Sequence, residues 1–372
     1  MLRTNFPIFE KKVFLNSCSK GALSLEVEKA YEQYLYDWKT LGSPWGLWVE
    51  KLEKVRRSFA QLINAEPDEI AVTTSVSAAV SSLASALSFE ERPKIVVSDF
   101  EFPTVAQNWH AQEARGAQVC HVAEEGGEIP LERLEAALDE KTKLLAISHV
   151  CYRNGAMQDA KAIAKLAHEQ GALLMLDAYQ SLGTMPINVK DLGVDILVGG
   201  TLKYLLGSSG LAFMYVRKDL LPELNPTVTG WFAQEDSMAL DIYHHLPAES
   251  ARRFESGTPP NPCVYAGIAG LELIHELGTA AIKAQLDALT DRLKNAAKTQ
   301  GYKLATPKAH GAMMALKAYD VETLVGLLET ADIIVSSRDG NLRVSPHFYN
   351  SEEDIDKLLT VLKKHEKLLC KA

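Results

Sequence analysis

The chain has 372 residues, of which 47% are hydrophobic and 23% are charged, a composition typical of globular proteins that excludes extended disorder and fibrous repeats. Its formal net charge of −9 argues against nucleic acid or an anionic membrane as the main partner. No apolar run approaches the roughly 18 residues of a membrane span. Residues 1–12 contain no apolar signal-peptide core, so we expect a cytoplasmic protein that does not enter a membrane.

Residues 45–217 alternate between helical and extended patterns. The apolar residues between Trp45 and Ile63 fall on one helical face, which predicts a helix over 45–63. Residues 159–170 predict another helix, which ends at Gly171. Short strands separated by helices predict a mostly parallel sheet that is covered on both faces. The apolar runs that we expect to form the strands are 69–73, 94–98, 118–122, 143–148, 172–177, 195–198 and 211–216.

The remaining residues predict a junction and a second, smaller unit. Six prolines interrupt residues 218–262, which we interpret as loops. Residues 263–372 predict a long helix, a further helix, two or three short strands and a last amphipathic helix. Ser351 and the three acidic residues after it are typical of the start of that last helix. The expected fold class is α/β, with a large domain over residues 16–250 and a small α+β domain formed by residues 1–15 and 251–372.

Several common functional motifs are absent from the sequence. No two glycines stand two positions apart, which excludes the dinucleotide-binding fingerprint, and the P-loop, HExxH and G-x-S-x-G motifs do not occur either. The five cysteines are odd in number and widely spaced, so they predict neither a disulfide framework nor a zinc site. His244 and His245 are adjacent and would point in different directions, so we expect no metal site.

An acid and a lysine follow two of the predicted strands. Asp177 ends the run 172–177, and Lys203 comes 26 residues later, just after the run 195–198, a spacing of about one β-α-β step. Ligands bind at the carboxyl ends of the strands in open α/β sheets, so the two side chains could face one crevice. Alternatively, Asp177 caps a helix and Lys203 is an ordinary surface lysine.

A lysine and a carboxylate that converge in this way suit pyridoxal phosphate. The lysine amine can form a Schiff base with the cofactor, and the carboxylate can keep the pyridine nitrogen protonated, so that the ring accepts electrons from the substrate α-carbon. The phosphate of the cofactor needs N–H groups and hydroxyls at a helix N-terminus. Residues 73–79 follow a predicted strand and open a helix, although taken alone they are only a good N-cap.

Ordered motifs over residues 69–356 resemble the class V aminotransferase superfamily of pyridoxal-phosphate enzymes. This superfamily includes cysteine desulfurases, isopenicillin-epimerase-like proteins and kynureninases, and the resemblance implies the fold-type-I architecture. The motifs that carry the resemblance are Phe102-Pro103-Thr104, His149-Val150-Cys151-Tyr152, Asp177-Ala178-Tyr179-Gln180, Gly200-Thr201-Leu202-Lys203, Gly230-Trp231-Phe232, Gly257-Thr258-Pro259-Pro260 and the ending Leu342–Asn350.

The resemblance implies roles for the residues around the cofactor ring. Lys203 forms the Schiff base, and Asp177 pairs with the pyridine nitrogen. Gln180 reaches the phenolic oxygen of the ring, and Phe102 stacks on the ring where desulfurases place a histidine. Trp231 matches a residue near the cofactor. For Phe102 and Trp231 the alternative is an ordinary buried aromatic residue.

The resemblance also implies a phosphate site that two chains share. Ser75, Val76 and Ser77 hold the phosphate through N–H and hydroxyl groups, and Thr201 adds a hydroxyl unless it is simply a strand residue. Thr258 matches a position that, in relatives, reaches the phosphate of the neighbouring subunit. We therefore expect a homodimer with shared active sites.

Arg343 matches the arginine that grips the substrate carboxylate in the superfamily. It stands between Leu342 and Val344, so on an extended segment it faces away from these apolar neighbours. The planar guanidinium offers two parallel donors that fit the two oxygens of a carboxylate. Without the resemblance, a surface or salt-bridged arginine is the alternative.

Two departures from the family pattern bear on the reaction. Desulfurases carry a catalytic cysteine shortly before this arginine, whereas residues 336–341 contain none. Kynureninases have a histidine in place of Gln180 and a tyrosine in place of Leu202. We therefore expect an aminotransferase that acts on an α-amino acid. The alternatives are a lyase or hydrolase that acts at Cα or Cβ, of the cysteine-lyase, desulfurase or kynureninase kind, and a non-catalytic binding protein with the same fold.

Overall fold

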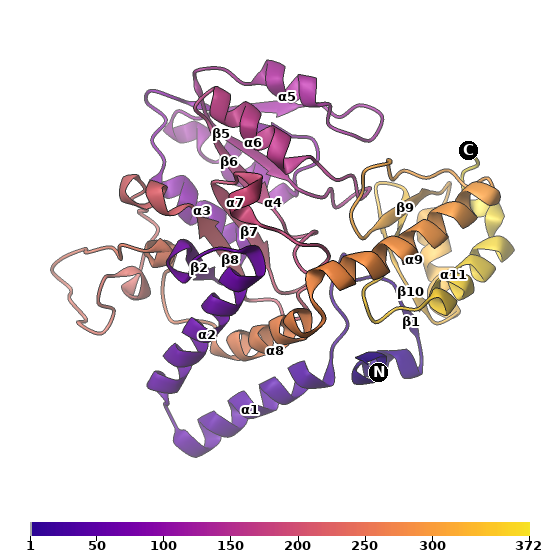
Figure 1. Ribbon diagram of the computed structural model, residues 1–372, viewed down its shortest axis with the longest axis horizontal. Helices are drawn as coiled ribbons and strands as arrows, with labels where there is room; N and C mark the ends of the chain where they lie inside the picture. The colour runs from indigo at the N-terminus through magenta and orange to yellow at the C-terminus, as the bar shows by residue number, and fades with distance from the viewer. Residues whose placement is uncertain (1) are drawn as a thin grey trace.

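The computed structural model describes residues 2–372, which form a large α/β body and a smaller body that contains the C-terminus (Figure 1). The large body is built on a seven-stranded sheet with the order β2-β8-β7-β6-β5-β3-β4. β4, β3, β5, β6 and β7 pair in parallel, whereas β8 runs antiparallel to both of its neighbours. The predicted mostly parallel sheet is therefore confirmed. Its strands are β2 (Ile70–Thr73), β3 (Lys94–Ser98), β4 (Gln118–Val122), β5 (Thr142–Ser148), β6 (Leu173–Asp177), β7 (Ile196–Gly200) and β8 (Ala212–Val216).

Helices cover both faces of this sheet, and the strand side chains alternate between two apolar layers. Leu174 and Leu176 of β6 join one layer with α2, α6 and α8, whereas Met175 joins the other layer with α3 and α4. Strands that are buried on both faces appear in the sequence as continuous apolar runs, which is why those runs marked them. Within residues 2–372, no helix is long and apolar enough to cross a membrane. The helices of the large body that follow β1 (Val13–Phe14) and α1 (Leu25–Leu41) in the chain are α2 (Trp45–Ile63), α3 (Val76–Ala86), α4 (Pro103–His110), α5 (Leu131–Ala137), α6 (Ala160–Glu169), α7 (Val189–Leu192) and α8 (Asn261–Leu277).

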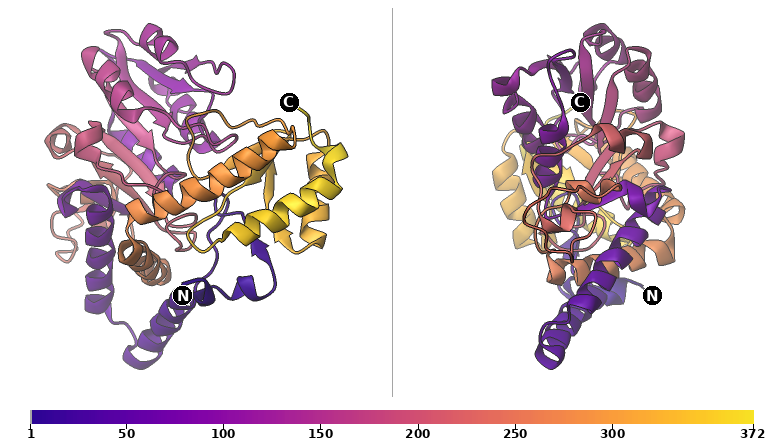
Figure 2. Two further views of the ribbon diagram at one scale, coloured as in Figure 1. Left: turned by 45° about the vertical axis from the view of Figure 1, so that its right-hand side comes forward. Right: turned by 90° about the vertical axis from the view of Figure 1, so that its left-hand side faces the viewer.

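Helix α1 (Leu25–Leu41) projects away from the large body, and the sequence analysis assigned no element to it (Figure 2). One side of α1 packs on α8, where Val27 lies against Ala266 and Ala269. Ser24 caps the helix by accepting a hydrogen bond from the N–H of Val27. Several apolar side chains in the C-terminal half of α1 remain exposed in the single chain. They are Leu35, Tyr36, Trp38 and Leu41.

The smaller body combines the N-terminal strand with the C-terminal part of the chain. β1 pairs in parallel with β10, with Val13 opposite Ile333, and a three-stranded antiparallel sheet has the order β11-β12-β9. Ser351 and Asp354 form a capping box at the start of α11, as the sequence predicts. Helix α8 packs in the core of the large body. The predicted division of the chain into domains at residue 250 stays a prediction. The elements here are β1 (Val13–Phe14), α9 (Thr279–Thr299), β9 (Met314–Lys317), α10 (Val321–Thr330), β10 (Ile333–Ile334), β11 (Ser336–Arg338), β12 (Asn341–Val344) and α11 (Glu352–Lys364).

Candidate functional site

A cavity of about 280 Å³ lies where β2, β5, β6 and β7 have their carboxyl ends. These strands point the same way, because β2 is antiparallel to β8 and β8 is antiparallel to β7. The cavity therefore lies at the carboxyl ends of the strands, where ligands bind in open α/β sheets. Seven of the residues singled out in the sequence line it, namely Ser75, Val76, Ser77, Phe102, Asp177, Gln180 and Lys203. The other lining residues are Thr74, Thr104, Ser148, Val150, Tyr152, Tyr179, Leu202, Ser209, Gly210 and Leu211.

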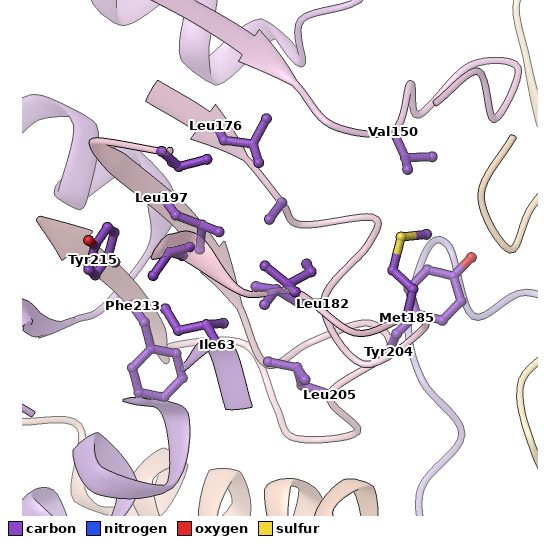
Figure 3. Packing of buried hydrophobic residues seen from close by; sticks show 14 of the residues in the cluster. Ile63, Val150, Leu176, Leu182, Met185, Leu197, Tyr204, Leu205, Phe213 and Tyr215 are labelled. Carbon is purple, nitrogen blue, oxygen red and sulfur yellow. The ribbon is translucent and has the colours of Figure 1, made fainter. Parts of the chain in front are cut away.

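Lys203 sits on the loop between β7 and β8, and its neighbours anchor that loop in the apolar core. Tyr204 and Leu205, the two residues after Lys203, are buried in the layer that the sheet shares with α2 and α8 (Figure 3). His347 of the smaller body fixes the loop from the other side, since its Nε2 lies 2.9 Å from the carbonyl oxygen of Tyr204. The amine of Lys203 is thereby held at a defined point of the cavity.

The same loop packs closely against α8, and Thr201 closes it internally. A Cβ atom at Gly270 of α8 would lie 2.3 Å from the carbonyl oxygen of Leu205, so only glycine permits this approach. Thr201 does not line the cavity, and its hydroxyl donates a hydrogen bond of 2.7 Å to the carbonyl oxygen of Ser208. The structure therefore places this hydroxyl in the loop itself rather than in the cavity.

Lys203 and Asp177 influence each other electrostatically inside the cavity. Burial lowers the pKa of Lys203 to about 8, although the negative charge of Asp177 acts in the opposite direction. Burial raises the pKa of Asp177, while a hydrogen bond from the N–H of Tyr179 and the charge of Lys203 lower it. Within residues 2–372 the Lys203 amine has no hydrogen-bond partner, and it lies 4.5 Å from the centroid of the Tyr179 ring. A buried amine with a lowered pKa is an effective nucleophile and proton acceptor.

The first turn of α3 faces the same cavity with polar groups. Ser75 is the N-cap, and its hydroxyl accepts a hydrogen bond from the N–H of Ala78 at 3.1 Å. The first N–H groups of a helix have no partner within the helix and carry a partial positive charge. The Ser77 hydroxyl lies 3.2 Å from that of Thr104. The N-terminus of α3 and the hydroxyls of Ser77 and Thr104 together form a site that fits a phosphate.

An N-terminal segment of the chain packs beside the cavity, against the lysine loop and Gln180, a contact that was not predicted from the sequence. The N–H of Gly21 donates to the carbonyl oxygen of Leu202, next to the lysine, at 2.9 Å. The side chain of Gln180 donates to the carbonyl oxygen of Cys18 at 3.0 Å, and its own amide oxygen is buried without a partner in the described chain. The thiol sulfur of Cys18 lies 3.9 Å from the Ser19 hydroxyl. No local pattern predicts these contacts, because they join residues about 160 and 180 positions apart.

Arg343 lies beside the cavity rather than in its lining. Leu342 and Val344 join the apolar core of the smaller body, so Arg343 faces the large body, the orientation that the alternation predicts. Its guanidinium donates to the carbonyl oxygen of Tyr152 at 2.8 Å and to the hydroxyls of Ser19 and Ser336 at 3.1 and 3.0 Å. Its Nε is buried and has no partner within residues 2–372, which leaves a donor for an anion.

Two aromatic rings stand together at the cavity. Phe102 is 43% exposed, and its ring lies edge-on to that of Tyr152 at a centroid distance of 5.1 Å. Tyr152 was quoted in the sequence analysis only as part of a motif, without a role. The position of its segment just after β5 is the signal that could have identified it, because β5 ends at this edge of the sheet.

Glu101, a buried acid behind the cavity wall, was not predicted from the sequence. Its carboxyl group accepts a hydrogen bond from the N–H of Ser148 at 3.0 Å and shares hydrogen bonds with the hydroxyls of Ser98 and Ser148 at 2.7 and 2.9 Å. Burial raises the pKa of Glu101 to about 8, and the charge of Asp177 acts in the same direction, whereas the hydrogen bonds lower it. Glu101 therefore holds a proton at neutral pH and adds little negative charge to the site.

The raised pKa of Glu101 predicts a pH-dependent loss of stability. Above the ordinary pKa the unfolded chain releases this proton while the folded chain keeps it, so the free energy of unfolding should fall as the pH rises from about 4.5 to about 8. Glu101→Gln keeps a neutral hydrogen-bonding group and should show a flatter dependence. Urea unfolding of both proteins across this pH range measures the difference, and equal slopes would contradict the prediction.

The structure does not bring Trp231 and Thr258 into the cavity of their own chain. Trp231 packs edge-on against Trp45 at a centroid distance of 5.7 Å. Thr258 is exposed, on a loop before α8. Their expected roles therefore stay predictions, and that of Thr258 requires a second chain.

A family model described as "Aminotransferase class-V" matches residues 14–358. The chain belongs to this family. The resemblance stated from its motifs is thus confirmed, and with it pyridoxal phosphate as the cofactor.

Individual relatives differ in the reactions that their names state. The uncharacterized aminotransferase YcbU of Bacillus subtilis is 38% identical over 355 residues, which cover 95% of this chain and 94% of the relative. A probable cysteine desulfurase of Methanothermobacter thermautotrophicus is 29% identical, over 96% of this chain and 95% of the relative. The solved structure of an apo cysteine desulfurase from Thermococcus onnurineus has a TM-score of 0.89 at 23% identity, covering 98% of this chain and 97% of that one. This structural likeness confirms the predicted α/β, fold-type-I architecture.

The groups around the cavity fit pyridoxal phosphate. The Lys203 amine has no hydrogen-bond partner within residues 2–372, and the Asp177 carboxylate accepts from the N–H of Tyr179 through only one of its oxygens. The buried amide oxygen of Gln180 also lacks a partner in the described chain. When bound, the cofactor supplies an aldehyde for the lysine and a pyridine ring that accepts electrons from the substrate.

Proposed function

We propose that this protein is an aminotransferase that acts on an α-amino acid. The observation that carries the proposal is the convergence of Lys203, Asp177 and the first turn of α3 on one cavity, with the partly unpaired guanidinium of Arg343 beside it. A site of this kind can bind the cofactor, hold the substrate carboxylate and move the α-proton. We also propose, from the sequence alone, that the protein works in the cytoplasm.

Each group has one task in this proposal. Lys203 binds the cofactor covalently and, once the substrate amine displaces it, takes and returns the α-proton, for which its lowered pKa suits it. Asp177 holds the proton on the pyridine nitrogen. Ser75, Val76 and Ser77 bind the phosphate, while Phe102 stacks on the ring.

Two further side chains orient the reactants. The amide of Gln180 lines the cavity, and we assign it to the phenolic oxygen of the ring. We assign the α-carboxylate to Nε of Arg343, which is buried without a partner in the described chain, and to Nη2, which would release the hydroxyl of Ser19 or Ser336 to receive it. Fixing the carboxylate and the amine at the same time leaves the α-hydrogen in a single orientation toward the base.

The segment before Arg343 favours aminotransfer over a desulfurase reaction. Residues 336–341 form a tight hairpin of β11 and β12, with Asp339 and Gly340 at the turn, and this hairpin contains no thiol. A desulfurase-type transfer of sulfur to a cysteine at this place has no acceptor. The relative that is 38% identical also bears the name of an aminotransferase.

The position of Cys18 favours a lyase as the second candidate. Its sulfur lies 3.9 Å from the hydroxyls of Ser19 and Ser336, and both hydroxyls accept hydrogen bonds from Arg343. A thiol is therefore present near the place where we expect the substrate carboxylate. We nevertheless expect that any sulfide release from cysteine survives the replacement of Cys18, because this thiol is 1% exposed.

A product screen distinguishes these reactions. The purified holoenzyme is given single amino acids with and without an added keto acid, and keto acid, ammonia, alanine and sulfide are followed together. Aminotransfer consumes the added keto acid and releases neither ammonia nor sulfide, whereas elimination releases them. Sulfide release that disappears in Cys18→Ala, while the fold and the visible absorbance persist, would replace the proposal with a thiol-dependent lyase.

We further propose a homodimer in which Thr258 completes the phosphate site of the other chain. The exposed apolar side chains in the C-terminal half of α1 and the exposed position of Thr258 support it. Sedimentation of the holoenzyme should give twice the mass of one chain at assay concentration. Charged replacements on α1, such as Trp38→Glu, should produce a monomer that binds the cofactor more weakly. A fully active wild-type monomer would contradict this prediction.

A further inference from the structure

Arg338 is a cation near the cavity that the proposed function does not use. It ends β11, five residues before Arg343, and its side chain is exposed. Within residues 2–372 its guanidinium takes part in no hydrogen bond and no ion pair. The carboxylate of its neighbour Asp339 lies 3.6 Å from Arg153 and forms no ion pair with Arg338 among the described residues.

The pairing of the hairpin puts Arg338 and Arg343 on one face. Ser336 is directly opposite Arg343, and Arg338 is opposite Asn341. Side chains that are opposite or two residues apart in such a pair share a face, so Arg338 stands on the face that Arg343 uses toward the large body. Leu342 takes the other face, in the core of the smaller body.

The charge of Arg338 acts on groups of the cavity. Burial is the main cause of the lowered pKa of Lys203, and the charges of Arg343 and Arg338 act in the same direction. The side chain is therefore electrically close to the reacting end of the site although it stands outside the lining.

Acidic groups do not cancel this positive charge. Among the residues that line the cavity, Asp177 is the one carboxylate, and the proposed function pairs it with the cofactor. Glu101 behind the wall keeps its proton at neutral pH because burial raises its pKa to about 8. Once a substrate α-carboxylate occupies Arg343, the guanidinium of Arg338 remains without an anion.

We propose that Arg338 binds a second acidic group at the end of the substrate side chain, so that the preferred substrates are α-amino acids with a distal carboxylate. This inference rests on the proposed function, in which Arg343 holds the α-carboxylate. Because the side chain of Arg338 is exposed, it is free to turn toward the substrate. The tight turn at Asp339 and Gly340 fixes the position of its backbone. Arg338 is thus a specificity-determining residue.

The test compares ligands that differ in charge and hardly in shape. α-Methylglutamate and α-methylglutamine lack the α-hydrogen, so they bind without turnover, and their binding to the holoenzyme is followed by the visible spectrum and by equilibrium dialysis. Wild type should bind the glutamate analogue at least about tenfold more tightly, as expected of a hydrogen bond between charged groups. Arg338→Ala should lose this preference, and Arg338→Lys should keep part of it.

A control variant shows whether the preference depends on Arg338 itself or only on the positive charge of this small sheet. Lys317→Ala removes one positive charge from the same small sheet, where Lys317 is opposite Asn341, and should keep the preference. An equal loss in Lys317→Ala, or a wild type that binds both analogues equally, would overturn the inference and leave the proposed function intact. A holoenzyme without visible absorbance would instead contradict the proposed function.

Discussion

Replacing Lys203 with alanine should remove the covalent attachment of the cofactor and lower turnover by about a thousandfold or more, since one side chain supplies both the nucleophile and the general base. The amine is buried, its pKa is lowered to about 8, and no other lysine lines the cavity formed by the described residues. The variant should still bind pyridoxal phosphate, because the phosphate and ring contacts do not depend on the lysine. Borohydride reduction followed by peptide mapping shows whether the cofactor is covalently attached and to which lysine.

Two lysines on the surface of the large body serve as controls for this experiment. Lys190 pairs with Glu66 at 3.5 Å, and Lys218 begins a short 3₁₀ helix after β8. Their alanine variants should keep both the reducible adduct and the activity. An adduct mapped to either of them in the wild type would overturn the assignment of the whole site.

Replacing Arg343 with lysine should weaken the binding of α-amino acids by about 2 kcal/mol or more, because a planar, bidentate and charge-assisted contact is lost. The spectrum of the holoenzyme without substrate should stay the same, since we assign the arginine to the substrate and not to the cofactor. Spectral titration with an inhibitory amino acid and with the amine that lacks its carboxylate checks both statements. Wild type should strongly prefer the acid, and the variant should not.

Arg153 provides the matched control for Arg343. Its guanidinium lies over the Phe100 ring and near Asp339, at the same junction between the two bodies but with its own partners. Arg153→Lys should retain the preference for the acid. If Arg343→Lys also retains it, another arginine, such as Arg338, holds the α-carboxylate.

The candidate site was largely predictable where its residues follow strand ends. Asp177 ends β6, Lys203 follows β7 and Ser75 follows β2, so short apolar runs and the polar residues after them predicted the convergence. The identity of the cofactor came from pairing the lysine with the acid, and the family motifs strengthened it. Prediction was weaker for Thr201, because a hydroxyl next to the lysine can equally bond within its own loop, as it does to Ser208.

Residues outside this pattern could not be found in the same way. Ser19 and Cys18 belong to a segment near the N-terminus, and no local pattern indicates that it crosses the lysine loop. Glu101 lies one position before a quoted motif, but its importance depends on being buried beside Ser148 of another strand. The raised pKa of Glu101 is a property of that burial and not of its sequence neighbours.

The sequence by itself determined the local structure and the family. Apolar runs defined the strands, Gly171 and Ser351 marked helix ends, and ordered motifs identified a class V enzyme, because these features depend on neighbouring residues and on short-range hydrogen bonds. Only the tertiary structure decided the antiparallel direction of β8, the pairing of β1 with β10 and the common face of Arg338 and Arg343. These depend on how distant segments cross and pair, which is set by burying apolar surface across the whole chain rather than by any local pattern.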